Sequence, residues 1–351
     1  MQVRISAGRP FKEGKNLLIR GTNWIGDAVM TLPAISAVRQ TFPGARITIL
    51  VKPWVAELFH LCPDVDEVMI FQSPGPHDGV AGKWRLAGEL RKKNFDTAIL
   101  LQNAIEAAII ALMAGIPVRA GYNSDVRGPL LSHSVRRTRA VREIHQTGYY
   151  LEMVRALGCE TSDAKVHLDA GRESGPLAES LIGRFGLDKG RLLIGMAPGA
   201  AYGPAKKWFP ERFAAVSDRL ADALPVQTVL FGSAGDREST DAVRRSATFP
   251  ILDLAGQTSL KEAMALMSRC RVFVSNDSGL MHVAAALGVP TVAIFGSTNT
   301  LTTAPVGRRV AIVHKPVPCS PCLKQTCPAD FRCMAMIGVD DVYDAARGLL
   351  E

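Results

Sequence analysis

The strongest constraint on the fold is a strand, a tight turn and a helix in immediate succession. An apolar β-branched run at 271–274 ends at the polar turn 275–279, and a helix rich in small residues follows at 282–287. A turn of this kind leaves free backbone N–H groups and the positive end of the helix dipole together, which suits an anion. Asp277 within the turn would repel a bare phosphate. The turn therefore favours a ligand with both a phosphate and sugar hydroxyls, as in a nucleotide sugar.

A second arrangement of the same design lies near the N-terminus. Residues 16–20 are typical of a strand, residues 21–27 form a turn with glycines and an acid, and residues 28–40 have helical spacing. The two turns lie about 250 residues apart. The repetition of this strand–turn–helix arrangement predicts two α/β domains that face a shared cleft.

Length and composition agree with two soluble domains. A chain of 351 residues with 47% hydrophobic and 21% charged residues is long enough for two separate cores. The most apolar stretch, 97–117, is interrupted by polar residues and is a poor candidate for a membrane span. Residues 1–15 are basic with no apolar stretch behind them, so no secretory signal is expected. These features predict a cytoplasmic enzyme.

Strand-like and helix-like runs alternate along almost the whole chain. This alternation predicts two doubly wound parallel sheets, each of the Rossmann-like kind. The periodicity is weakest at 169–176, which we interpret as the linker. The predicted domains are therefore 1–170 and 171–339, and we expect the final helix at 340–351 to pack back on the first domain.

The net charge of +8 indicates anionic partners. Acceptor phosphates and anionic lipid head groups are the candidates, and a solvated helix face is the plain alternative. No basic motif interleaved with aromatic residues favours nucleic acid. The basic residues that gather along the first half are Lys83, Arg85, Arg91, Lys92, Lys93, Arg127, Arg136, Arg137, Arg139 and Arg142.

Asp27 has two interpretations. Aspartate is a favoured N-cap, so Asp27 is a candidate cap for the helix that follows. Its turn also contains Asn23, Trp24 and Gly26, an unusual set for a cap. A carboxylate in such a turn is a candidate base for an acceptor hydroxyl, and the helix N-terminus would keep it ionised.

Further candidates lie in the second half. Lys207 follows a strand in the Gly/Pro-rich loop 198–211, where a lysine suits a diphosphate, although Lys206 offers the same charge. Asp236 ends another strand-to-turn segment, a position from which carboxylates commonly hold ribose hydroxyls. His282 lies one turn after Asp277 and is a candidate contact of the same pocket, with simple packing as the alternative.

Four of the seven cysteines are crowded together. Their pattern is Cys319-x2-Cys322-x4-Cys327-x5-Cys333. In a cytosolic protein such spacing suggests a metal before a disulfide. It is not a pair of CxxC knuckles, however, so zinc or an iron–sulfur centre is not favoured and we expect no cofactor.

The motifs together resemble one family, the ADP-heptose:lipopolysaccharide heptosyltransferases of glycosyltransferase family 9. The resemblance runs from about Asn16 to the C-terminus and appears in order at several separate motifs. It is carried by Asn23-Trp24-Ile25-Gly26-Asp27, by Gly203-Pro204-Ala205-Lys206-Lys207-Trp208 and by Ser275-Asn276-Asp277-Ser278-Gly279-Leu280-Met281-His282. It implies a GT-B fold, in which two Rossmann-like domains face a central cleft, with the acceptor on the first domain and the nucleotide sugar on the second.

The resemblance also implies roles for individual residues. In the family, the acid matching Asp27 is the proposed general base and the lysine matching Lys207 holds the diphosphate. The acid matching Asp277 binds heptose hydroxyls. The remaining substrate contacts implied are Asn23 and Gly26 in the first turn, Asp236 at the ribose, Thr258 near the adenine, backbone donors at Ser278, Gly279 and Leu280, and His282.

The implied reaction is inverting transfer of L-glycero-D-manno-heptose from ADP-heptose to a heptose already on the phosphorylated Kdo–lipid A core. A basic first domain is then expected to meet the cytoplasmic face of the inner membrane peripherally. A family member that adds the first heptose, or another inner-core sugar, is the nearest alternative. A dinucleotide-dependent oxidoreductase is disfavoured because the first turn has no GxGxxG and the second strand ends at Lys52. A non-catalytic protein that binds a nucleotide sugar or a lipid is a further alternative. Only an observed catalytic turnover of substrate would exclude it.

Overall fold

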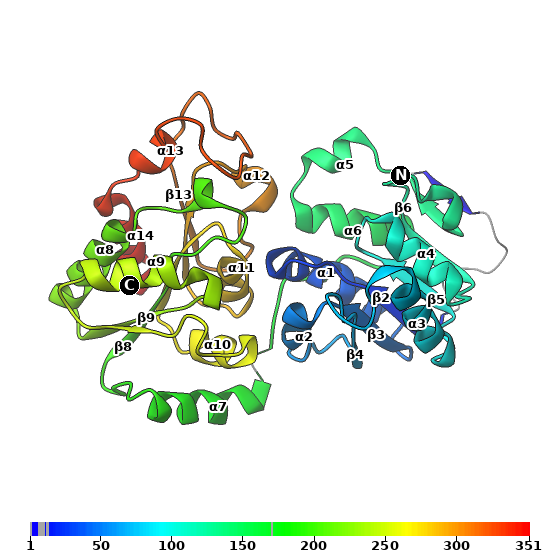
Figure 1. Ribbon diagram of the computed structural model, residues 1–351, viewed down its shortest axis with the longest axis horizontal. Helices are drawn as coiled ribbons and strands as arrows, with labels where there is room; N and C mark the ends of the chain where they lie inside the picture. The colour runs from blue at the N-terminus through cyan, green and yellow to red at the C-terminus, as the bar shows by residue number, and fades with distance from the viewer. Residues whose placement is uncertain (1, 6–10, 12–13, 170) are drawn as a thin grey trace. The chain divides into compact units, whose positions relative to one another are not determined.

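Two α/β units make up the chain, divided between His167 and Leu168. The computed structural model describes residues 2–5, 11, 14–169 and 171–351. Parts of the basic N-terminal stretch, Arg9 and Lys12 among them, lie outside the described residues. Each unit is built on its own sheet, as the alternating pattern predicts (Figure 1). No helix in the described part of the chain combines the length and the apolar character that crossing a bilayer requires.

The sheet of the first unit has the strand order β1-β7-β6-β5-β2-β3-β4. All neighbouring pairs are parallel except β1 with β7, which is antiparallel and was not predicted. The strands are β1 (Val3–Ile5), β2 (Asn16–Arg20), β3 (Arg46–Val51), β4 (Glu67–Ile70), β5 (Thr97–Leu100), β6 (Val118–Tyr122) and β7 (His133–Val135). The helices are α1 (Ile25–Thr41), α2 (Pro53–Phe59), α3 (Gly79–Lys92), α4 (Ile105–Met113), α5 (Arg139–Glu143) and α6 (Gln146–Ala156).

The sheet of the second unit has the order β10-β9-β8-β11-β12-β13, and every pair in it is parallel. Its strands are β8 (Leu192–Ala197), β9 (Val226–Leu230), β10 (Ile251–Asp253), β11 (Val272–Asn276), β12 (Thr291–Phe295) and β13 (Val310–His314). Its helices are α7 (Gly171–Arg184), α8 (Pro210–Ala223), α9 (Arg237–Ser246), α10 (Leu260–Met267), α11 (Gly279–Ala286), α12 (Thr300–Thr303), α13 (Arg332–Ala335) and α14 (Val339–Leu350).

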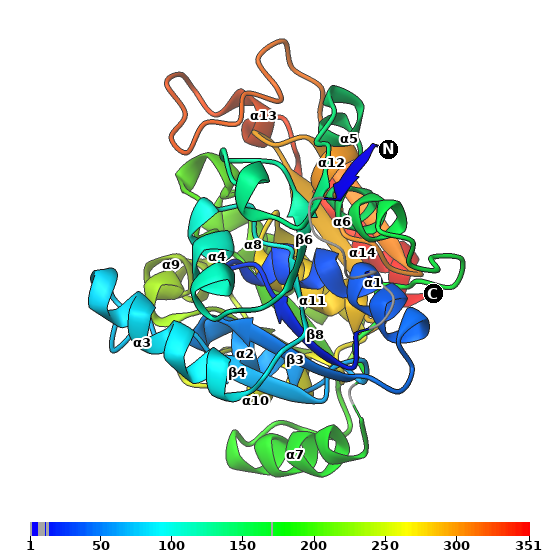
Figure 2. The same cartoon turned by 90° about the vertical axis from the view of Figure 1, so that its right-hand side faces the viewer.

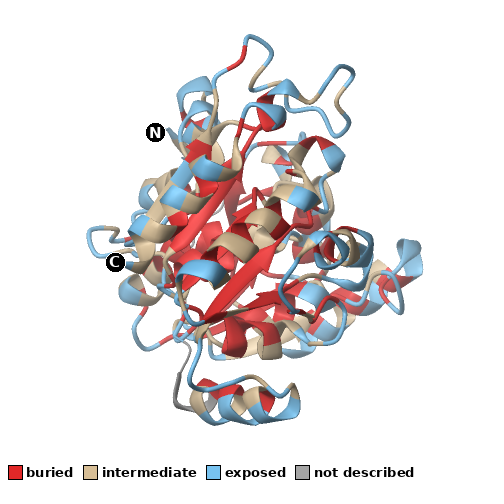
Figure 3. Cartoon of the chain, turned by 90° about the vertical axis from the view of Figure 1, so that its left-hand side faces the viewer, coloured by how far each residue is buried: buried red, intermediate tan, exposed pale blue. Residues whose placement is uncertain are grey.

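Helices cover both faces of the second sheet, which explains why its central strands β8, β11 and β12 are largely apolar. Successive residues of β12 point to opposite faces. Ile294 packs with Val292 in a large cluster that includes side chains of α8 and α14, whereas Phe295 packs with Met281 of α11. These three central strands are accordingly buried almost throughout, whereas much of the exposed surface lies on the helices and loops (Figure 3).

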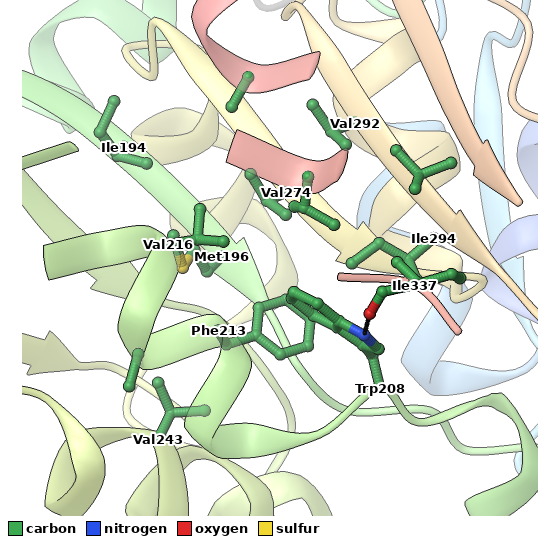
Figure 4. Close-up of a cluster of buried hydrophobic side chains, with 14 of the residues drawn as sticks. Ile194, Met196, Trp208, Phe213, Val216, Val243, Val274, Val292, Ile294 and Ile337 are labelled. Atoms are coloured by element: carbon green, nitrogen blue, oxygen red, sulfur yellow. Dashed lines mark hydrogen bonds between the residues drawn. The ribbon is translucent and has the colours of Figure 1, made fainter. Parts of the chain in front are cut away.

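The large cluster also contains Trp208, which follows the loop after β8. Its indole N–H donates to the carbonyl oxygen of Ile337 at 3.1 Å, and its ring meets Phe213 edge-on (Figure 4). Because the indole is buried, this hydrogen bond offsets the cost of taking its N–H out of water. The loop before Trp208 is thereby anchored to the core.

The structure corrects two predictions about the domains. The segment 169–176 is not a linker throughout, because α7 begins at Gly171 and contains Pro176. Helix α7 lies beside α10, apart from the strands (Figures 1 and 2). The C-terminal helix does not join the first unit: Val342 and Ala346 of α14 are buried in the core of the second sheet. The sequence predicted this helix, but not the surface against which it packs.

Candidate functional site

In both sheets the strand order reverses at one point. The chain moves from β8 to β9 and β10 on one side, and then returns to β11 on the other side of β8. Ligands of open parallel sheets bind at the carboxyl ends of the strands at such a switch point. The loops after β8 and β11, which carry the predicted motifs, therefore lie at the expected position in the second unit.

Asn276 joins these two loops. Its side chain is fully buried, its Oδ1 accepts from the backbone N–H of Trp208 at 3.0 Å, and its Nδ2 donates to the carbonyl oxygen of Pro198 at 2.7 Å. Both ends of the loop after β8 are thus tied to the end of β11. Asn276 is not among the site residues predicted from the sequence. Its position at the end of a strand, next to Asp277, was the available signal.

Asp277 is almost completely buried and lies in an ion pair. Its Oδ2 is 2.6 Å from Nζ of Lys206 and accepts from the hydroxyl of Thr298, also at 2.6 Å. Only 4% of Asp277 is exposed. A carboxylate in this setting needs such partners because desolvation penalises a lone charge. Lys206 therefore meets Asp277, whereas Lys207 does not.

Lys207 reaches a different part of the same site. Its Nζ donates to Oγ of Ser239 at 3.0 Å, near the start of α9. Asp236 lies just before this helix and accepts from the backbone N–H and the hydroxyl of Ser233 at 2.9 and 2.7 Å. The other oxygen of Asp236 lies against Gly199, where a Cβ would come within 2.1 Å of it. Lys207 and Asp236 are thus gathered beside the loop after β8.

The start of α11 supplies backbone donors. Ser278 is its N-cap, and no side chain in the described part of the chain donates or accepts a capping hydrogen bond there. The residues that follow, Gly279 and Leu280, are partly exposed. The N–H groups of this first turn are therefore available to an anion, and the helix dipole favours negative charge there. His282 belongs to the same helix but is buried, with 4% of its surface exposed.

Thr258 lies in the loop before α10, and that loop adjoins the one containing Asp236. The backbone N–H of Gly256 donates to the carbonyl oxygen of Gly232 at 2.9 Å. Ser259 caps α10 and forms a capping box with Glu262. The structure thus brings the loops of Thr258 and Asp236 together.

In the first unit, Asp27 is not an N-cap. Helix α1 begins at Ile25 with Trp24 as its N-cap, so Asp27 is in the first turn of the helix. Asp27 as a residue is partly exposed. Burial, followed by the negative charge of Asp27, raises the pKa of the buried Tyr150 well above its usual value. Asp27 therefore lies near the phenol of Tyr150 on α6.

Asn23 and Gly26 lie beside Asp27 at the switch point of the first sheet, after β2 and next to β5. Oδ1 of Asn23 accepts from the guanidinium of Arg20 at 3.0 Å, and its carbonyl oxygen accepts from the indole N–H of Trp54 at 2.8 Å. Gly26 is partly exposed in the first turn of α1. These contacts fix the turn that presents Asp27.

The cysteine-rich segment packs against the loop after β8. The backbone N–H of Ala205 donates to the carbonyl oxygen of Gln325 at 2.9 Å, and the hydroxyl of Tyr202 donates to that of Leu323 at 2.7 Å. Burial raises the pKa of the Cys333 thiol, and negative charge on Cys319 and Cys327 adds to the rise. None of the seven cysteines, all of which lie within the described residues, forms a disulfide. Within the described ranges, no three His, Cys, Asp or Glu side chains are grouped to hold a metal ion.

The fold and the second-unit site define an α/β protein with two parallel-stranded sheets, in which a helix start and two lysines suited to an anionic ligand lie at the switch point of the second sheet. Comparison with known proteins gives the family: residues 83–331 match the model of glycosyltransferase family 9 (heptosyltransferase). The chain belongs to this family and is a glycosyltransferase.

Its relatives include lipopolysaccharide heptosyltransferase 2 of Escherichia coli (strain K12), which is 30% identical over 315 residues, covering 85% of this chain and 87% of the relative. Lipooligosaccharide heptosyltransferase 2 of Haemophilus influenzae is 29% identical over 318 residues, covering 85% and 88%. Among solved structures, E. coli ADP-heptose lps heptosyltransferase II superposes with a TM-score of 0.82 at 27% identity, covering 96% of this chain and 98% of that one. The predicted family and class of enzyme are confirmed.

Proposed function

We propose that the protein transfers L-glycero-D-manno-heptose from ADP-heptose to a heptose on the Kdo–lipid A core, with inversion at the anomeric carbon. The observation that carries the proposal is the second-unit site. An uncapped helix N-terminus, a buried acid and two lysines meet there at the switch point of the sheet. Similarity to heptosyltransferases 2 over most of the chain supports the choice of donor and acceptor.

The donor is assigned to the second unit. The first-turn N–H groups of α11 and Lys207 would hold the diphosphate, and Asp236 would accept from ribose hydroxyls. Asp277 would accept from heptose hydroxyls through the oxygen that neither Lys206 nor Thr298 occupies. The same donors stabilise the negative charge that develops on ADP as the glycosidic bond breaks.

The acceptor base is assigned to Asp27 in the first unit. Its carboxylate takes the proton of the acceptor hydroxyl as the oxygen attacks the anomeric carbon, and ADP leaves with the electron pair of the broken bond. The reaction so written needs no cofactor. We also propose that the basic first unit associates peripherally with the cytoplasmic face of the inner membrane, through attraction that added salt weakens.

The test is release of ADP from ADP-heptose in two parallel reactions, one with Kdo–lipid A and one with mono-heptosylated Kdo–lipid A. Turnover with only the second acceptor supports the proposal. Turnover with the first makes the protein the enzyme that adds the first heptose. Absence of turnover with both, in a preparation that binds ADP, refutes heptosyl transfer to this core.

A further inference from the structure

Three cations converge at the carboxyl edge of the first sheet, around the ring of Phe71. The guanidinium of Arg20 lies 5.1 Å from the ring centroid, and Nζ of Lys52 and Lys83 lie at 4.1 and 4.5 Å. The three residues come from the ends of β2 and β3 and from α3. Because all three cations lie close to the same ring, three positive charges are gathered in one small region.

The charges in this cluster are not fully compensated by the protein. Lys83 is paired with Glu106 at 3.2 Å, but Lys52 donates to the neutral carbonyl oxygen of Ser73 at 2.6 Å. Arg20 donates to the carbonyl oxygens of Gly21 and Leu50 and to Asn23, so none of its partners is a carboxylate.

The pKa of Lys52 also indicates an excess of positive charge around this residue. Burial, together with the charges of Arg20 and Lys83, lowers the pKa of Lys52 even though Glu106 and Asp78 act in the opposite direction. The surroundings of Lys52 are therefore net positive, which favours the arrival of an anion.

Buried donors without partners lie at the same switch point. Nε of Arg20 and the hydroxyl of Thr22 make no hydrogen bond within the described structure, although both residues are at least nine-tenths buried. Buried polar groups are almost always satisfied, so unsatisfied donors beside a cationic cluster indicate a missing acceptor. The exposed indoles of Trp24 and Trp54 flank this region and offer flat surfaces on which a sugar ring packs.

We infer that Arg20, Lys52 and Lys83 form a binding site in the first unit for an anionic group of the acceptor. Carboxylate and phosphate share the required chemistry, because both accept charge-assisted hydrogen bonds from guanidinium and ammonium groups. In a Kdo–lipid A acceptor the carboxylates belong to Kdo and the phosphates to lipid A. This inference rests on the proposed function for the identity of the acceptor.

The sequence pattern included Lys83 among the clustered basic residues but not Arg20 or Lys52. Among the clustered basic residues, Arg127 is fully buried and donates to the carbonyl oxygens of Tyr122, Leu100 and Gln102. Lys93 is paired with Glu67 at 2.5 Å. Arg127 and Lys93 thus already have hydrogen-bond or ion-pair partners within the first unit. Arg20 and Lys52 do not belong to the clusters of basic residues seen in the sequence.

The test compares Lys52→Met and Lys83→Met with wild type, measuring KM for the acceptor and for ADP-heptose separately. Loss of a charge-assisted contact predicts an acceptor KM raised roughly tenfold or more, with the ADP-heptose KM unchanged. The acceptor KM of each variant should also depend less on salt than that of wild type, an effect that a structural role would not produce. Lys92→Met, at an exposed position of the same helix as Lys83, is the matched control. Unchanged acceptor KM in both variants overturns the inference.

Two modified acceptors distinguish the sources of the anion. If the site binds a Kdo carboxylate, reducing the carboxyl groups should raise the wild-type KM and abolish its difference from Lys52→Met. Removing the lipid A phosphates should do so if the site binds phosphate. A difference that survives both modifications shows that the site binds neither group.

Direct binding separates this inference from the proposed function. If the wild-type protein turns over neither Kdo–lipid A nor its mono-heptosylated form, the proposed function is refuted. The anion site is then tested alone, by following tryptophan fluorescence while free Kdo or inorganic phosphate is added. Trp54 reports on the site because Lys52 lies 5.9 Å from its ring. A saturable change lost in Lys52→Met supports the anion site, and no change with either probe refutes it.

Discussion

Lys206→Met tests the buried ion pair that links the two loops of the donor site. The substitution retains a long unbranched side chain but leaves Asp277 with the hydroxyl of Thr298 as its remaining partner among the contacts described. Removing one member of a fully buried pair typically costs 3–5 kcal/mol in the free energy of unfolding. The Lys206 side chain is 15% exposed, so water partly screens the remaining charge and the expected loss is about 2–4 kcal/mol.

Two further variants make the reasoning specific. Lys207→Met removes the adjacent lysine, whose Nζ bonds only to the hydroxyl of Ser239 among the contacts described, so the expected loss is about 0.5–1.5 kcal/mol. Adding Asp277→Asn to Lys206→Met removes the stranded charge and should restore about 1–3 kcal/mol relative to additivity.

The assay is urea denaturation followed by circular dichroism, with the midpoint and slope fitted for each variant. A Lys206→Met protein within about 0.5 kcal/mol of wild type would show that the pair is solvated and contributes little. Strict additivity in the double variant would show that Lys206 acts on the fold without Asp277. Either result refutes the argument from burial.

Three other predictions concern the site. Asp27→Asn should reduce ADP release to background while ADP-heptose binding, measured by calorimetry, stays within about twofold of wild type, because the amide cannot take a proton; lost donor binding would contradict this. Asp277→Ala should weaken binding of ADP-heptose by roughly tenfold or more but leave ADP binding nearly unchanged, and equal losses would remove its role at the sugar. Asn276→Ala leaves the N–H of Trp208 and the carbonyl of Pro198 unpaired, so urea denaturation should show a loss of about 1–3 kcal/mol; a smaller loss would mean that water replaces the amide.

Most elements were predictable because their signals are local. The run at 16–20 coincides with β2, and the apolar run at 271–274 begins within one residue of the start of β11. The boundaries that failed are those where the local signal misleads. Gly175 and Pro176 lie inside α7, where burial of Ala178 and Leu181 outweighs the low propensity of the segment.

The site was predicted unevenly for the same reason. Asp27, Asp236 and Asp277 each lie in a turn made of consecutive residues, so each turn can be recognised from the sequence. The partner of Asp277 was not predictable, since Lys206 and Lys207 are adjacent and have the same side chain. Packing decides between them by tying Trp208 to Asn276.

By itself, the sequence determined two α/β units, the turns that end their strands, and the family. Only the tertiary structure decided that Lys206 meets Asp277, that Lys52 joins Arg20 around Phe71, and that α14 packs against the second sheet. The physical reason is the parallel sheet. Parallel neighbours are joined by long crossovers, so residues that share one edge of a sheet are far apart in the chain, and no local periodicity records which strands lie side by side.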